Sequence, residues 1–141
     1  MSDLDNNYMT REDGFKKDFK IPEGLSRKGK QLANKIRAMA EKGEWTAGGC
    51  TVFHKPDSEN FEYGKGSELI VCYDGGYVGT FFDYDAAYEV ECNVQDCAKE
   101  FGWDMSEHKP YSGLEMMDEF LKKLGVYSEP CTKWYTAIYK D

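Results

Sequence analysis

The sequence predicts an α+β domain in which an antiparallel sheet of about four or five strands is covered by about three α-helices. Hydrophobic patterns follow one another as helix, strand, hairpin, helix, helix, strand, an order that differs from the regular alternation of a parallel sheet. The 141 residues have the length of one domain, and 40% of them are hydrophobic. A chain of this size and composition buries a core without disulfides or metals.

The N-terminal 20 residues differ from the rest of the chain. Residues 1–20 carry no apolar periodicity, so we expect a flexible or loosely docked tail there, followed by a single domain over residues 21–141. No apolar stretch approaches the roughly 20 residues that a membrane helix needs, and the N-terminus lacks the apolar segment of a signal peptide. These features predict a cytoplasmic protein that does not enter membranes.

A first helix is predicted from residue 27 to about residue 42. Ser26 is a residue type that caps helix N-termini, and Gly43 is a type that ends helices. The apolar positions recur at i, i+4 and i+7 on one face, which we expect to be buried: Leu32, Ile36 and Met39.

Strands are predicted next, at residues 45–54 and 67–73, where β-branched and aromatic residues lie between Gly, Pro and Asp. The residues Asp74-Gly75-Gly76 separate SELIVCY from YVGTFF, so the sequence predicts a hairpin over residues 67–82. A glycine loop that cradles a phosphate is the alternative for the same residues, although the Lys-Ser/Thr of a P-loop is missing.

Two helices and a C-terminal strand complete the prediction. One helix begins at about Asp83 and ends before Gly102, with one clean apolar stripe. The other follows Ser112, which forms a capping box with Glu115. The last segment, VYSEPCTKWYTAIYKD, is predicted as one strand or as two short strands interrupted at Pro130.

Charge is unevenly distributed along the chain. The net charge is −8, which argues against a nucleic-acid-binding surface over the whole molecule. On the helix predicted between residues 83 and 101, four carboxylates fall on one line over about 22 Å. We interpret this line as a partner-binding stripe that resembles a run of phosphates, with an ordinary solvated face as the alternative. The acidic stripe consists of Asp85, Glu89, Asp96 and Glu100.

The first helix carries the opposite charge. Its basic residues are candidates for contact with phosphate or with an acidic partner, including a second copy of the chain. The candidate residues are Arg27, Lys28, Lys35 and Arg37. Because the whole chain is acidic, we expect a basic or nucleic-acid-handling protein as partner before nucleic acid itself.

Aromatic residues near the C-terminus form a third candidate surface. Trp134, Tyr135 and Tyr139 could stack on a small nucleotide-like ligand, although aromatics of a half-buried sheet more commonly pair across strands in the core.

Cysteine and histidine offer a weaker case for catalysis. Five cysteines without a C-x-x-C pair indicate reduced thiols, most of them small core residues. A thiolate–imidazole pair would require Cys50, His54 and Cys131 to meet in space, which no spacing dictates. We therefore expect no catalytic residue, no metal site and no cofactor.

Five segments carry a resemblance: GLSRKGKQLANKI, GGCTVF, SELIVCYDGG, FFDYD and CTKWYTAIY. They resemble a loosely defined set of small uncharacterised proteins encoded by phages and other mobile elements. The resemblance brings no activity and no site residues. It implies a protein of the host-cell cytoplasm that acts by stoichiometric binding to host machinery, such as a defence or nucleic-acid-processing complex. The sequence thus predicts a non-enzymatic inhibitor that mimics nucleic acid, with a nucleotide-binding protein as the alternative.

Overall fold

The structure of the chain, a computed structural model, describes residues 11–74, 76–83, 98–104, 106 and 112–141. The described elements follow in chain order: α2 (Arg11–Asp18), α3 (Arg27–Gly43), β1 (Phe53–His54), β2 (Leu69–Cys72), α4 (Gly79–Phe82), α6 (Ala98–Phe101), α7 (Gly113–Lys123), β3 (Val126–Pro130) and β4 (Tyr135–Lys140).

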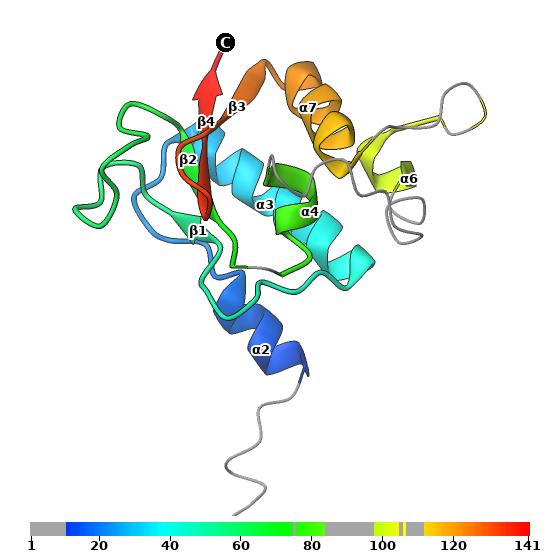
Figure 1. Cartoon of the computed structure of the whole chain (residues 1–141), viewed down its shortest axis with the longest axis horizontal. Coiled ribbons are helices and arrows are strands. Elements are labelled where there is room, and N and C mark those ends of the chain that lie inside the picture. The colour runs from blue at the N-terminus through cyan, green and yellow to red at the C-terminus, as the bar shows by residue number, and fades with distance from the viewer. Residues whose placement is uncertain (1–10, 75, 84–97, 105, 107–111) are drawn as a thin grey trace, which may run out of the picture.

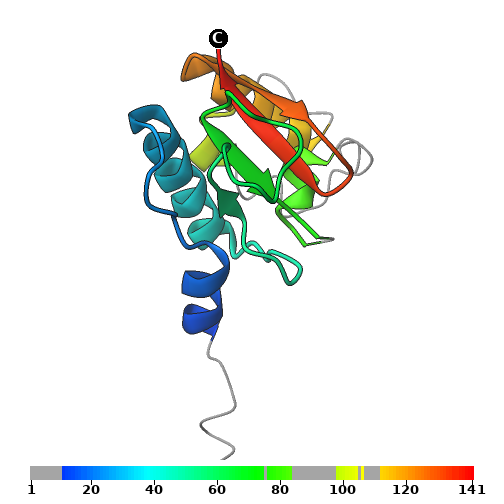
Figure 2. The ribbon, with the colours of Figure 1, turned by 90° about the vertical axis from the view of Figure 1, so that its left-hand side faces the viewer.

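One antiparallel sheet organises the fold. Its four strands lie in the order β1-β2-β4-β3, so β2 and β4 are central and β1 and β3 form the edges. The helix α3 runs beside one face of the sheet, and α2 extends below it (Figures 1 and 2). This arrangement confirms the predicted α+β class.

The larger core lies between the sheet and the helices. It joins apolar side chains of α3, β2, α4 and α7, each of which is almost fully removed from water. Its most deeply buried members include Leu32, Ile36, Leu69, Val71, Phe81, Phe82, Met116, Met117 and Leu121. We call the sheet face that contacts this core the inner face.

The two long helices, α3 and α7, form as predicted because each has its N-cap residue and an apolar face that is buried. The Ser26 hydroxyl accepts a hydrogen bond from the Gly29 N–H at 3.0 Å, and the Ser112 hydroxyl accepts one from the Glu115 N–H at 3.1 Å. The first helix ends one residue later than predicted. Gly43 still belongs to α3, and Glu44 takes the left-handed conformation at φ 55°.

The ordered fold begins earlier than the sequence analysis expects. Residues 1–10 lie outside the described residues, but the rest of the predicted flexible tail forms α2 and its continuation. Phe19 is 1% exposed and stacks on Phe15 at 4.6 Å between ring centroids. The Asp18 carbonyl also accepts a hydrogen bond from Val52 N–H at 2.8 Å. Phe15 and Phe19 dock this segment, and a helix of only eight residues is too short to give a clear apolar periodicity in the sequence.

The predicted hairpin over residues 67–82 is wrong in its second half. The strand β2 is present, but the residues after it form the short helix α4, and β2 pairs with β1 and β4 instead. A Cβ on Gly76 would overlap the backbone nitrogen of Gly48, so this glycine allows two backbone segments to cross. The N–H of Val78 then donates to the Thr46 carbonyl at 3.1 Å.

The strand predicted at residues 45–54 is also shorter in the structure, where only Phe53–His54 is a strand. Gly48 and Gly49 have φ of 75° and 104°, which interrupts an extended backbone.

The helix predicted from Asp83 falls largely on residues 84–97, outside the described residues, and α6 with Gly102 after it agrees with the predicted end.

The C-terminal segment forms two strands, the second of the two alternatives. Pro130 is the last residue of β3, and β4 begins at Tyr135. The two faces of β4 differ, because Ile138 contacts the larger core while Tyr135 and Ala137 belong to a second cluster on the opposite face. We call this opposite side the outer face of the sheet.

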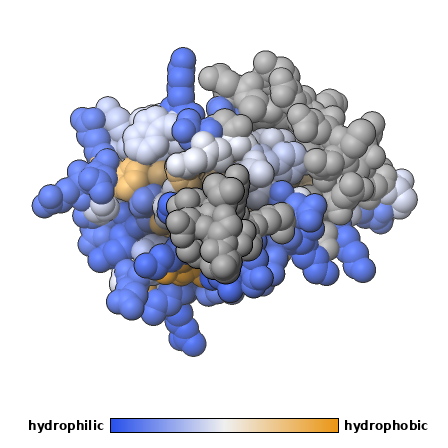
Figure 3. All heavy atoms as spheres, turned by 90° about the horizontal axis from the view of Figure 1, so that it is seen from below, coloured by the Kyte–Doolittle hydropathy of each residue, from blue (hydrophilic) through white to orange (hydrophobic). Residues whose placement is uncertain are grey.

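The molecular surface seen from below is mainly hydrophilic and is interrupted by small hydrophobic patches (Figure 3). Among the described residues, no helix has both the length and the apolar character to cross a membrane.

Candidate functional site

The outer face of the sheet carries a small hydrophobic cluster of its own. Successive side chains of a strand point to opposite faces, so alternate residues of β2 and β4 reach this side. The buried members are Phe61, Ile70, Cys72, Tyr135 and Ala137. Most of them come from the two central strands, and Phe61 comes from the loop between β1 and β2.

That loop, residues 55–67, lies across the outer face, and we call it the cover loop. Phe61 is 3% exposed and lies 5.0 Å from the ring centroids of both His54 and Tyr135. A Cβ on Gly64 would meet the side chains of Ile70 and Ala137, so only glycine lets the loop backbone approach the sheet this closely. The cover loop is therefore part of the folded structure.

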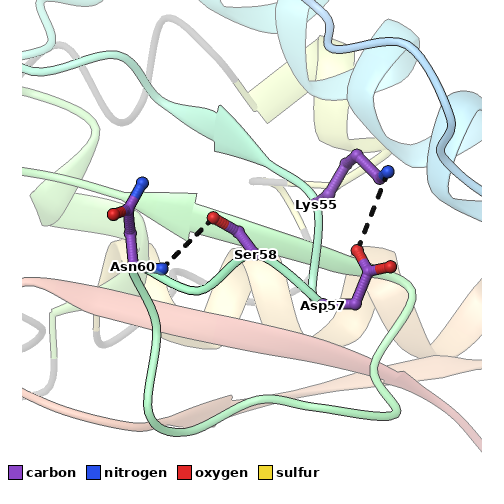
Figure 4. A network of polar contacts seen from close by, with 4 residues as sticks. All are labelled: Lys55, Asp57, Ser58 and Asn60. Atoms are coloured by element: carbon purple, nitrogen blue, oxygen red, sulfur yellow. Dashed lines mark hydrogen bonds and ion pairs between the residues drawn. The ribbon is translucent and has the colours of Figure 1, made fainter.

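Polar contacts within the cover loop hold its first turn (Figure 4). Lys55 Nζ lies 3.9 Å from Asp57 Oδ1, and the Asn60 N–H donates to the Ser58 hydroxyl at 3.3 Å. Both contacts are exposed to solvent, so they shape the turn more than they stabilise the fold.

Three large aromatic side chains remain half exposed around this cluster. The exposed fractions are 53% for Tyr63, 47% for Tyr127 and 48% for Trp134. Two of these rings contact residues of the outer face: Tyr127 stacks on Tyr139 at 5.6 Å, and Trp134 contacts Tyr135 edge to face at 4.6 Å. We call Tyr63, Tyr127 and Trp134 the aromatic surface.

The three aromatic residues singled out in the sequence have different positions. Trp134 is exposed, Tyr139 is half-buried, and Tyr135 is buried at 2% exposure. The Tyr135 hydroxyl accepts a hydrogen bond from the backbone N–H of Tyr63 at 3.0 Å, so this ring anchors the cover loop. Tyr135 is therefore a structural residue and is not available for stacking on a ligand.

Sequence reasoning missed Tyr63 and Tyr127 as surface residues. Tyr127 stands opposite Tyr139 in the register of the β3–β4 hairpin, so a correct pairing of the two strands would have found it. Tyr63 lies in a polar loop whose path over the sheet depends on Gly64 and Phe61, and local sequence carries no signal for that path.

The cysteine and histidine candidates contact the same region without forming a catalytic pair. Cys50 Sγ donates to the Ala47 carbonyl at 3.2 Å, His54 Nε2 lies 2.9 Å from the Thr51 carbonyl, and Cys131 Sγ donates to the Glu129 carbonyl at 3.6 Å. Each side chain thus has a backbone partner of its own.

Burial also keeps the described thiols protonated. It raises the pKa of Cys50 and Cys131, and it raises the pKa of Cys72 to about 12, with a smaller contribution from the neighbouring Cys50. A thiol nucleophile needs the opposite shift. The environment of these three cysteines therefore suits core residues better than catalytic ones.

The predicted basic residues of α3 divide into two pairs. Arg27 and Lys35 are exposed on the outer side of the helix. Lys28 Nζ instead donates to the Leu124 carbonyl at the end of α7, at 3.1 Å, and the Arg37 guanidinium lies 6.0 Å from the Phe15 ring centroid. The second pair links α3 to other helices, so part of its charge has a structural role.

The acidic stripe lies outside what the structure describes. Asp85, Glu89 and Asp96 fall within residues 84–97, and Glu100 lies in α6 but its side chain is not described. The stripe therefore remains a prediction from sequence.

A small cavity of about 200 Å³ lies between α2 and the loop after α3. Its lining includes Phe15, Asp18, Phe19 and Trp45, away from the aromatic surface.

Among the described residues, no group of three or more His, Cys, Asp or Glu side chains could hold a metal ion.

Comparisons of the chain with protein-family models, with curated proteins and with solved structures find no match.

Proposed function

We propose that the chain is a non-enzymatic interaction protein that binds a protein partner stoichiometrically through its aromatic surface. The observation that carries the proposal is the exposure of about half of Tyr63, Tyr127 and Trp134 around one sheet face. Tyr and Trp are enriched among the residues that dominate protein–protein binding energy, because a large rigid ring excludes water at low entropic cost.

The arrangement of these rings supports binding without rearrangement. Tyr127 is held by its stack on Tyr139, and Trp134 is held against Tyr135 and Phe61. Side chains that are already ordered lose little rotamer entropy on association, which improves affinity for a given contact area.

The resemblance to small phage proteins suggests the class of partner. We propose a basic or nucleic-acid-handling host protein, such as part of a defence complex, with inhibition as the outcome of binding. The acidic stripe of Asp85, Glu89, Asp96 and Glu100 would contribute the electrostatic part of recognition. The cytoplasm of the host cell is the compartment in which such a partner would be met.

A nucleotide-like ligand on the same aromatics is the alternative proposal. The burial of Tyr135 and its hydrogen bond to the cover loop weigh against it, because one of the three rings proposed to stack on the ligand is covered by protein. An extended contact with a protein surface uses these rings better than a pocket would.

The test is affinity capture from host lysate with three baits at equal concentration. The wild-type chain and a control with Lys122→Ala and Lys123→Ala should retain the same partner, since both lysines are exposed on α7. A variant with Tyr127→Ala and Trp134→Ala should lose it. Circular dichroism of all three baits establishes that they are folded.

Two outcomes would contradict the proposal. Equal retention by the aromatic variant would show that the partner binds elsewhere. A nucleotide released on denaturing the wild-type bait, accompanied by a rise in melting temperature when that nucleotide is added back, would favour the small-molecule alternative.

A further inference from the structure

The outward side of α3 is the most strongly basic surface among the described residues. The helix carries six basic residues and one acidic residue, a net charge of +5 over 17 residues. Its apolar stripe faces the sheet, so the charged positions face solvent. Figure 2 shows the helix along one side of the molecule with no element beyond it in that view.

Three of these basic residues make no ion pair with a carboxylate in the part of the chain that the structure describes. Arg27, Lys30 and Lys35 are exposed, and no carboxylate of the described residues lies within ion-pairing distance of them. At 100° per residue they fall within an arc of about 140°, and they extend over about 12 Å of the helix axis. Their charges therefore reach solvent together on one side of the helix.

The other exposed residues on this side distinguish between kinds of partner. Gln31 and Asn34 are exposed between the basic residues, and Ala38 is the one exposed apolar residue of the helix. Glu41, the one acidic residue of α3, is exposed on the same side but lies about 9 Å along the axis beyond Lys35. Protein–protein interfaces are depleted in Lys and use aromatic or large aliphatic anchors, which this side lacks. Phosphate groups, in contrast, are contacted by Arg, Lys, Asn and Gln side chains.

We propose that the outward side of α3 binds the phosphate backbone of double-stranded nucleic acid, without sequence preference. A duplex is favoured over a single strand because single-strand sites add aromatic rings on which bases stack, and no aromatic side chain belongs to α3. This surface is separate from the aromatic surface, which lies on the outer face of the sheet, so the proposal does not depend on the proposed protein partner.

The net charge of −8 does not prevent such binding at physiological salt. Charges separated by more than about 8 Å of solvent are largely screened at 0.15 M ionic strength. A phosphate in contact with Arg27 or Lys30 therefore responds mainly to the nearby charges of α3. Nucleic-acid binding, which the net charge makes unexpected for the whole molecule, becomes reasonable for this one helix.

The experiment measures binding of the whole chain to a fluorescent 30-base-pair DNA duplex between 50 and 200 mM salt. Each phosphate contact contributes a slope of about 0.9 to the fall of log K with log salt, so three contacts predict a slope near 2.7 and roughly a 40-fold loss of affinity over this range. The variant R27Q/K30Q/K35Q should bind at least tenfold more weakly at 50 mM salt and with a much smaller slope.

The matched control is K122Q/K123Q/K140Q, which removes the same three charges from exposed sites outside α3. It should retain most of the affinity and the slope of the wild-type chain. Equal weakening of both variants would show a general charge effect and overturn the proposal, as would absence of duplex binding by the wild-type chain at 50 mM salt. A salt-sensitive dimer in sedimentation without duplex binding would also overturn it, since α3 would then serve a second copy.

Discussion

The cover loop depends on one side chain, Phe61, and removal of its ring should destabilise the whole protein. In Phe61→Ala the contacts with His54, Tyr135 and Trp134 are lost together, at centroid distances of 5.0, 5.0 and 5.8 Å. The loop then has few other apolar contacts with the sheet, because Phe61 is its largest buried side chain.

The magnitude follows from burial. Phe61 is 3% exposed, and replacement of a buried Phe by Ala costs about 3–5 kcal/mol in the free energy of unfolding, from lost transfer energy and from the cavity left behind. We expect the lower end, about 3 kcal/mol, because a loop can collapse toward the space more readily than a central strand. With a urea m-value of about 2 kcal/mol/M, the unfolding midpoint should fall by about 1.5 M.

Urea unfolding followed by far-UV circular dichroism measures this shift. The control is Tyr63→Ala on the same loop, which is 53% exposed and donates only its backbone N–H to Tyr135, so its effect should stay within about 0.5 kcal/mol. A loss below about 1 kcal/mol for Phe61→Ala, or equal losses for the two variants, would refute the view that the cover loop is part of the cooperative fold.

Three further predictions concern the sheet and the place where the backbone at Gly76 crosses residues 46–48. Gly76→Ala should cost about 2 kcal/mol or more in thermal or urea unfolding, because the new Cβ would meet the backbone of Gly48; an unchanged midpoint would contradict the crossing. Tyr73→Phe removes a buried 2.8 Å hydrogen bond to the Thr136 hydroxyl and should cost about 1 kcal/mol, and adding Thr136→Val should cost less in this background than in the wild type. The pKa of Cys72 is raised to about 12 in the folded state, so the thiol loses its proton at a lower pH in the unfolded chain than in the folded chain. Proton loss by the unfolded chain favours unfolding, so the free energy of unfolding should fall as pH rises from about 9 toward 12. Urea midpoints at pH 8 and pH 10 should differ less in Cys72→Ala than in the wild type, and an equal difference would assign the fall to other groups.

Local signals made the long helices and the central strands predictable. Ser26 and Ser112 are the caps that sequence reasoning assigned to α3 and α7, and their hydrogen bonds are formed. The apolar run at residues 67–73 predicted a strand, and β2 forms there and pairs on both sides. These features depend on residues within a few positions of one another, so a single sequence contains them.

Other features depend on contacts between distant segments. Gly75-Gly76 is typical of a hairpin turn, yet Gly76 serves close approach to residues 46–48, and local sequence does not distinguish the two uses of glycine. One of the two strands that pair with β2 is β4, about 65 residues later, and only tertiary structure selects it. For the same reason only Trp134 of the aromatic surface was predicted, since the cover loop decides which rings stay exposed.

The position of β4 has a consequence for synthesis of the chain. This strand is central in the sheet, yet it comprises residues 135–140 and is separated from its neighbour β2 by the helices α4, α6 and α7 and by β3 along the chain. While the ribosome is still adding these residues, β2 lacks its main neighbour and β3 has no strand to pair with. We therefore expect the nascent chain to hold α3 and a partly exposed apolar β2 until residues 135–140 have left the ribosome, and a pause before that point would expose this strand to chaperones and proteases.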